Sequence, residues 1–180
     1  QYFSDVPTDK TYFDLLESEL LKIRPSRTIF RFNAQRKTVR SVQRFILPIG
    51  KDAEWVKTEY VTWLPKILSL FIGVKYDGSS VVYSLHYFEI KLLELKQNID
   101  RSNNDRQLLY ITDGLLVSGA NGGRLEFRVV LNRQFVLAAI HDYNPSLPWF
   151  IYKYSQALVH LLVMRGFGQH LAVKAARETI

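Results

Sequence analysis

His141 and the acid that follows it, Asp142, form the most suggestive pair for chemistry in this sequence. They end an apolar run that begins at Phe135, immediately before a loop and a long apolar segment. The end of a strand at the mouth of a hollow is a typical position for a site. Successive strand residues point to opposite faces, so both side chains face inward only if the strand has already ended. The alternative for the pair is a structural role in capping the loop.

His160 is the second candidate, because it lies inside the apolar C-terminal segment, one helical turn after Gln156. It is either a hydrogen-bonded core residue or a contact for a ligand or a proton. The four histidines are far apart in sequence, whereas metal binding requires several ligands to converge. No phosphate-binding loop, dinucleotide fingerprint or nucleophile elbow occurs. We therefore predict no metal and no cofactor. A non-enzymatic role is favoured, and in the enzymatic alternative His141/Asp142 or His160 act as acid and base.

Positive charge is concentrated in one part of the chain. The net charge is +7, yet eight basic residues and no acid lie between Lys22 and Arg44, and the remainder is close to neutral. Such a tract attracts phosphates, anionic membranes or acidic protein surfaces. The alternative is the solvated face of a strand pair. No recognised nucleic-acid motif is present, so no specific nucleic acid is predicted. The candidate anion-binding residues are Arg27, Arg31, Arg36, Lys37 and Arg40.

The composition predicts a single domain, residues 1–180. A chain of 180 residues with 47% hydrophobic and 13% aromatic residues can bury a full core, which excludes a disordered protein. The lack of Cys excludes a disulfide scaffold and a Cys-ligated zinc or iron–sulfur site, and it favours a cytoplasmic location. The apolar stretch 149–164 is too short, and too interrupted by polar residues, to predict a transmembrane segment.

The spacing of apolar residues indicates the elements that position these candidates. Helices are predicted at about 8–23, 52–72 (interrupted by Pro65) and 147–173, and strands at 27–33, 38–47, 80–96, 107–118, 124–131 and 135–142. The run 38–47 also fits a helix face, and its β-branched residues and the proline that follows favour the strand. On the strand at 124–131, Glu126 and Arg128 share one face, where a surface pair is the expected role.

Segregated strands followed by a long helix indicate an α+β fold, since a doubly wound sheet would alternate helices and strands. We predict a curved antiparallel sheet of about six strands wrapped on the long C-terminal helix, a helix-grip-like arrangement, with an additional N-terminal helix. Such a sheet leaves a hollow between itself and the helix, and this hollow is either filled by aromatic side chains or open to a ligand.

The segment from Asp105 to Ala172 resembles an uncharacterised bacterial domain family. The matching signals are the strand Gly-Arg-Leu-Glu-Phe-Arg at 123–128, the His141-Asp142 strand end and the aromatic opening of the last helix. Members of that family occur attached to NAD-binding epimerase-like domains. The family is similar in turn to the START-like, helix-grip superfamily (SRPBCC), whose members hold apolar ligands between sheet and C-terminal helix. The resemblance implies a NAD-binding epimerase-like partner domain.

The leading functional prediction is a domain that binds a small hydrophobic or amphipathic ligand between the sheet and the C-terminal helix. The first alternative is an interaction module that uses the basic tract 22–44 to bind an anionic membrane, a nucleic acid or a protein. The second is the enzyme described above. The predicted ligand-binding residues are Tyr83, Tyr87, Tyr110, Phe127, Tyr154, Leu158 and His160.

Overall fold

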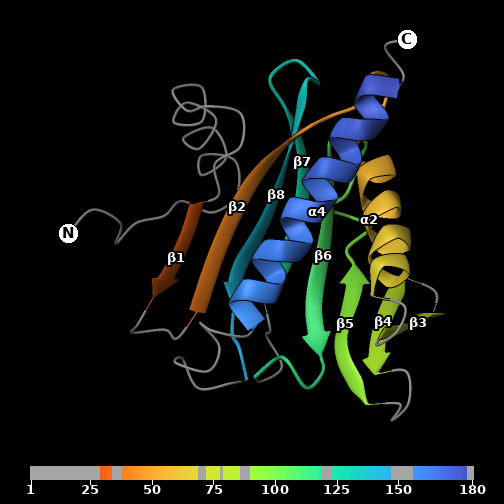
Figure 1. The fold of residues 1–180 in the computed structure, drawn as a ribbon. Helices are drawn as coiled ribbons and strands as arrows, with labels where there is room; N and C mark the ends of the chain where they lie inside the picture. The colour runs from red at the N-terminus through yellow and green to blue at the C-terminus, as the bar shows by residue number, and fades with distance from the viewer. Residues whose placement is uncertain are drawn as a thin grey trace.

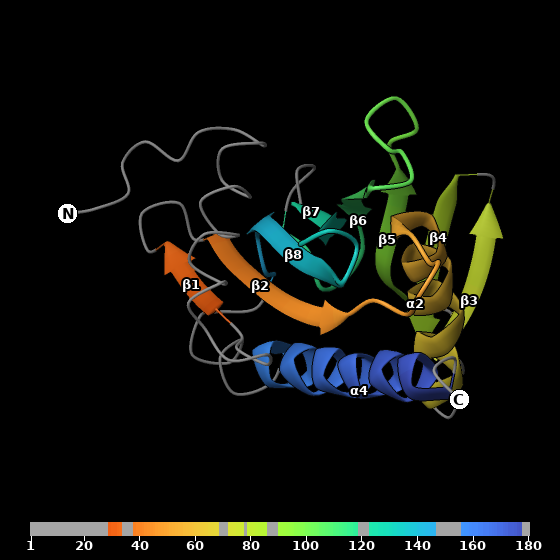
Figure 2. The same cartoon turned by 90° about the horizontal axis from the view of Figure 1, so that it is seen from above.

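The computed structural model describes residues 29–33, 38–68, 72–77, 79–85, 90–118, 123–146 and 156–177. These residues form one antiparallel sheet and two helices that lie on the same side of it (Figures 1 and 2). The strand order is β1-β2-β8-β7-β6-β5-β4-β3. The strands are β1 (Ile29–Asn33), β2 (Thr38–Ile46), β3 (Ile72–Asp77), β4 (Ser80–Leu85), β5 (Lys91–Gln97), β6 (Arg106–Asp113), β7 (Arg124–Val130) and β8 (Phe135–Tyr143), and the helices are α2 (Ala53–Ile67) and α4 (Gln156–Arg177).

The predicted fold class is wrong in its details, although the described residues do combine a sheet with helices. The sheet has eight strands rather than about six. The run 80–96 contains two strands, β4 and β5, and Ile72, assigned above to the end of a helix, begins β3. The helix-grip arrangement is also wrong, because two helices share the sheet: α4 contacts β2, whereas α2 contacts β6 and β7. The helix expected at 8–23 lies outside the described residues.

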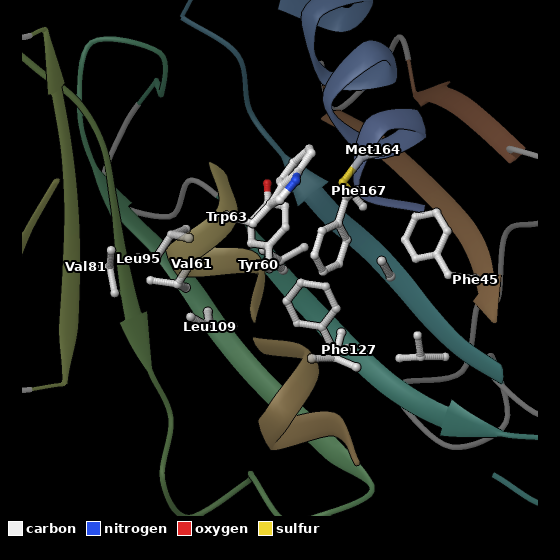
Figure 3. Packing of buried hydrophobic residues seen from close by; sticks show 14 of the residues in the cluster. Phe45, Tyr60, Val61, Trp63, Val81, Leu95, Leu109, Phe127, Met164 and Phe167 are labelled. Carbon is white, nitrogen blue, oxygen red and sulfur yellow. The ribbon is translucent and has the colours of Figure 1, made fainter. Parts of the chain in front are cut away.

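Aromatic side chains fill the space between the sheet and the two helices (Figure 3). Phe167 of α4 is fully buried, and its ring centroid lies 5.1 Å from that of Tyr60, 5.4 Å from that of Trp63 and 6.4 Å from that of Phe127. These rings come from both helices and from the middle of the sheet, so one cluster joins all three. Burial of this apolar surface is the main stabilising contribution to the fold.

Two glycines allow α4 to come this close. A Cβ atom at Gly168 would lie 2.7 Å from the ring of Phe45, which is closer than carbon atoms approach one another, and one at Gly166 would lie 3.2 Å from the ring of Trp63. The sequence Gly166-Phe167-Gly168 therefore places one large ring in the core and removes the side chains that would hold the helix away from β2 and α2.

A cluster of charged groups joins the two helices at the edge of this core. Glu59 of α2 accepts a hydrogen bond of 2.9 Å from Lys174 and lies 2.6 Å from Nε2 of His170, both on α4. Burial alone would raise the pKa of Glu59, but the hydrogen bonds with His170 and Lys174 outweigh that effect and lower the pKa below its ordinary value of 4.5.

We expect the substitution Glu59→Gln to lower the free energy of unfolding at neutral pH by about 1–2 kcal/mol, because it removes a charged acceptor from two donors. A lowered carboxyl pKa stabilises the fold above the pKa of the unfolded chain, and that contribution is lost as the pH falls through the folded value. The difference between wild type and variant, measured by urea denaturation, should therefore shrink below about pH 4.5. A difference that stays constant with pH would contradict this assignment.

Neither of the two described helices is long and apolar enough to cross a lipid bilayer.

Candidate functional site

A cavity lies on the outer face of the sheet, the face turned away from α2 and α4. Its volume is about 360 Å³. Along β5, β6 and β7 its polar residues alternate with Leu95, Leu109 and Leu125, which pack into the core on the helix side. Because alternate strand residues point to opposite faces, the polar residues belong to the outer face. The cavity is lined by Lys96, Tyr110, Ile111, Thr112, Gly123, Arg124, His141 and Asp142.

The register of the sheet aligns four of these residues in one row across four strands. Lys96 of β5 pairs with Tyr110 of β6, Tyr110 pairs with Arg124 of β7, and Arg124 pairs with His141 of β8. Directly opposed residues in neighbouring strands have side chains in contact range. The row therefore gathers two cations, a phenol and an imidazole from segments up to 45 positions apart in the chain.

A β-bulge lets both members of the His141-Asp142 pair line the cavity. Between two regular partner pairs, Val39 with Tyr143 and Ser41 with Ile140, the β8 strand carries two residues, His141 and Asp142, opposite one on β2. Asp142 adopts a φ of 51°, a left-handed conformation that aspartate tolerates better than most residues. This conformation interrupts the alternation of side chains and turns Asp142 to the same cavity as His141.

The residue opposite the bulge holds Asp142 in place. Arg40 donates hydrogen bonds to Oδ1 of Asp142 from Nε at 3.0 Å and from its terminal nitrogen at 2.6 Å. The acid at the cavity wall is therefore compensated within the fold. The two hydrogen bonds from one guanidinium to one carboxylate oxygen also fix the bulge, since both are charge-assisted.

A buried ion pair lies beside the row, on the same face of the sheet. Glu126, two residues after Arg124 on β7, is fully buried and accepts a hydrogen bond of 2.6 Å from Nε of Arg106. Its other oxygen, Oε2, lies 3.7 Å from Nε2 of His141. The expected surface position of Glu126 is therefore wrong, because the residue is fully buried, and a buried carboxylate requires a partner such as Arg106.

His141 is uncharged at neutral pH in this environment. Its side chain is 3% exposed. Burial lowers the pKa of His141 to about 3, and the positive charges of Arg124, Arg40 and Arg106 act in the same direction, whereas Asp142 opposes them. An imidazole with so low a pKa is a weak base near neutral pH, and it serves better as a hydrogen-bonding group than as a general base.

The predicted ligand-binding residues do not form one site. Of the seven, Tyr110 lines the cavity. Tyr83 and Phe127 are buried in the core on the helix side. His160, on α4, is half-buried, and burial lowers its pKa to about 4. Tyr87 and Tyr154 lie outside the described residues, as does the side chain of Leu158.

The predicted anion-binding tract is described only in part. Arg31 is exposed on the edge strand β1, and Arg40 binds Asp142. Arg27, Arg36 and Lys37 lie outside the described residues. Among the residues that the structure describes, no group of three His, Asp or Glu side chains is placed to hold a metal ion.

Among the polar lining residues, three were missed by sequence reasoning: Lys96, Thr112 and Arg124. Each stands at an outward position of a predicted strand, so alternation alone could have assigned each to the outer face. Their meeting in one row depends on the pairing of β5, β6 and β7, which no local pattern in the sequence shows.

Comparison with known proteins gives one similar sequence. No family model matches the chain. A distant likeness in structure is found to CalU16 from Micromonospora echinospora, with a TM-score of 0.32 and 9% identity over 84% of this chain and 97% of that one, which is too weak to support an argument. None of the comparisons supports the resemblance to the SRPBCC superfamily or to an epimerase-associated family. The chain is 28% identical over 139 residues to the auxiliary protein GraX from Staphylococcus aureus, which covers 76% of this chain but 44% of GraX, so the chain spans less than half the length of the protein it is similar to.

Proposed function

We propose that this domain binds a small molecule in the outer-face cavity. Ligand binding was also predicted from the sequence, but between the sheet and the C-terminal helix, whereas the site proposed from the structure lies on the opposite face of the sheet. The observation that carries the proposal is the row Lys96, Tyr110, Arg124 and His141, which the register of the sheet brings to one cavity. Its volume of about 360 Å³ falls in the range of small-molecule sites. Between β7 and the helices, by contrast, the rings of Phe127 and Phe167 occupy the space.

Thr112 supports the proposal independently. Its Oγ1 atom is buried at the cavity and has no hydrogen-bond partner among the described residues. A buried hydroxyl without a partner costs about 1–3 kcal/mol, and a ligand with a polar group could remove that cost. Tyr110 offers a second hydroxyl, which accepts a hydrogen bond of 3.3 Å from Arg101.

The substitution Thr112→Phe tests this proposal, because the larger ring would occupy the cavity. We expect any ligand found for the wild-type protein, in a screen of small acids, amines, alcohols and amides by saturation-transfer NMR, to bind the variant at least about 100-fold more weakly. Thr62→Phe, at an exposed position of α2, is the matched control and should leave binding unchanged. A wild-type protein that binds no compound, or equal binding by wild type and Thr112→Phe, would refute the proposal.

The other functional predictions stay predictions. The interaction module was predicted to use the basic tract, and Arg44 belongs to that tract. Arg44 is buried, and its guanidinium lies 4.7 Å from the centroid of the Phe135 ring, so this residue stabilises the fold and is not on the surface for a partner. The NAD-binding epimerase-like partner domain, the enzymatic alternative and the cytoplasmic location have no observation on the described residues that favours them.

A further inference from the structure

We propose that the outward side of α4 binds the surface of an anionic lipid bilayer. This inference goes beyond the function proposed above, because it concerns the helix layer on the opposite side of the sheet from the cavity. It is also separate from the predicted basic tract 22–44. It follows from the residues that α4 exposes, from the contrast with α2 and from the signs of the charges on α4.

The exposed side of α4 is mainly apolar. Met164, Phe167 and Leu171 are buried in the core at helical spacing, so they face the sheet. The exposed positions repeat at the same spacing on the opposite side of the helix. They are Val159, Leu162, Arg165, Gln169, Val173, Ala176 and Arg177. The three large apolar residues among them are each at least half exposed. Figure 2 shows α4 along one side of the molecule, outside the sheet.

The neighbouring helix shows what an ordinary exposed side contains. On α2 the exposed residues are Glu54, Thr58, Thr62, Lys66 and, at its last position, Ile67. A helix that packs on a sheet normally presents charged and polar residues to water, and α2 follows that rule up to its final residue. α4 does not, since four of the seven residues that the structure describes as exposed on it are apolar. Because both helices lie on the same side of the sheet, the difference is a property of α4 and not of the layer.

The charges on α4 are all positive. The sequence of this helix contains Arg165, Lys174 and Arg177 but no Asp or Glu. Lys174 is held by Glu59 of α2. The side chains of Arg165 and Arg177 have no ion pair or hydrogen bond with any residue that the structure describes. Both guanidinium groups are therefore available for a phosphate or a carboxylate, the anionic groups of lipid headgroups.

An anionic bilayer matches both properties of this face. Its headgroups attract the two arginines, and its hydrocarbon boundary receives the exposed apolar side chains, while the long arginine stems reach back to the headgroups. The 22 residues of α4 form a rod of about 33 Å, which can lie flat on such a surface. A second copy of this chain would bring the same cations together without an acid on α4 to pair with them. Charge complementarity therefore favours the bilayer over a symmetric dimer.

Flotation of the full chain with lipid vesicles tests this inference. The vesicles contain phosphatidylcholine alone, or phosphatidylcholine with about 30% phosphatidylserine. We expect the partition coefficient of the wild-type protein to be about 10-fold or more higher for the anionic vesicles, and the preference to fall as salt is raised.

A fluorescent label locates the face that touches the lipid. The chain contains no Cys, so Leu162→Cys can carry a single environment-sensitive dye. Its emission should shift to the blue when anionic vesicles are added, because the dye enters a less polar environment. The same dye on Asp100→Cys, at an exposed position of the loop after β5, should not shift.

Substitutions separate the two contributions. The double variant Arg165→Gln/Arg177→Gln should lower the partition coefficient about 10-fold or more, because each cation near an anionic surface contributes about fivefold. Leu162→Ser should lower it about fivefold or more, because less apolar surface is then buried. The matched control, Arg31→Gln/Lys75→Gln, removes the same charge from exposed positions on the edge strands β1 and β3 and should leave binding unchanged. All these side chains are exposed, so circular dichroism should show every variant folded.

Equal binding to neutral and anionic vesicles would overturn the inference. So would the lack of binding to either, and an acidic groove on another protein would then be the partner that this face fits. A loss in the control as large as in Arg165→Gln/Arg177→Gln would also overturn it, because binding would follow net charge or the basic tract instead of α4. A dye at position 162 that does not shift while the protein floats would place another face on the bilayer. None of these outcomes bears on the outer-face cavity, whose test is the ligand screen.

Discussion

Replacing Phe167 with alanine is expected to lower the free energy of unfolding by about 3–5 kcal/mol. The ring is fully buried and sits between α2, α4 and the sheet, within 6.4 Å, centroid to centroid, of the rings of Phe45, Tyr60, Trp63 and Phe127. The loss combines the transfer free energy of the ring with the cavity that it leaves. That cavity cannot collapse easily, because the surrounding rings belong to three different elements.

Urea denaturation followed by circular dichroism measures this effect. Leu162→Ala is the matched control, because Leu162 lies on the same helix with 57% of its surface exposed. The control should change the free energy of unfolding by less than about 1 kcal/mol. A loss below about 1 kcal/mol for Phe167→Ala would mean that α4 does not share a core with α2 and the sheet.

Local patterns identified the strands that form the centre of the sheet. The alternation of residues 124–131 and the apolar run from 135 correspond to β7 (Arg124–Val130) and β8 (Phe135–Tyr143). Asp52, at the predicted start of the second helix, accepts a hydrogen bond of 2.8 Å from the N–H of Trp55, as an N-terminal cap does. These features depend on neighbours in the sequence, so the sequence shows them.

Features set by distant contacts were not predictable in this way. The alternation of apolar and polar residues correctly placed Glu126 on the face of its strand opposite the core. Glu126 is nevertheless fully buried, because exposure of that face depends on other parts of the chain that pack on it. For the same reason, alternation cannot distinguish the filled face under α4 from the face with the cavity, since both carry aromatic and polar residues. The predicted number of strands was two too low, because the run 80–96 contains two strands without a turn signal between them and because β3 was not predicted.

The site shows the same division. His141 and Asp142 stood out because of their residue types and their position at a strand end, and both line the cavity. The objection that neighbours on a strand point to opposite faces is removed by the bulge, where Arg40 of β2 is the opposing residue and binds Asp142. Arg124 and Lys96 had no such local signal, because only the pairing of the strands brings these two residues to the same cavity.

Acidification should destabilise the protein more steeply when His141 is present than when it is replaced by glutamine. The unfolded chain binds a proton at His141 near pH 6.5, whereas burial and the nearby arginines lower the pKa of folded His141 to about 3. Between these values the unfolded state holds more protons, so the free energy of unfolding falls as the pH falls. The expected contribution is about 1.4 kcal/mol for each pH unit within that window, and it ends below about pH 3.

The comparison of wild type with His141→Gln isolates this contribution. His160, whose pKa burial lowers to about 4, destabilises the folded state in the same direction, but it is present in both proteins and cancels. Urea denaturation from pH 7 to pH 4 should therefore give curves that converge or cross as wild type loses stability faster. Parallel curves would mean that His141 titrates alike in the folded and unfolded states. The imidazole at the wall of the cavity would then not be shielded from water in the folded protein.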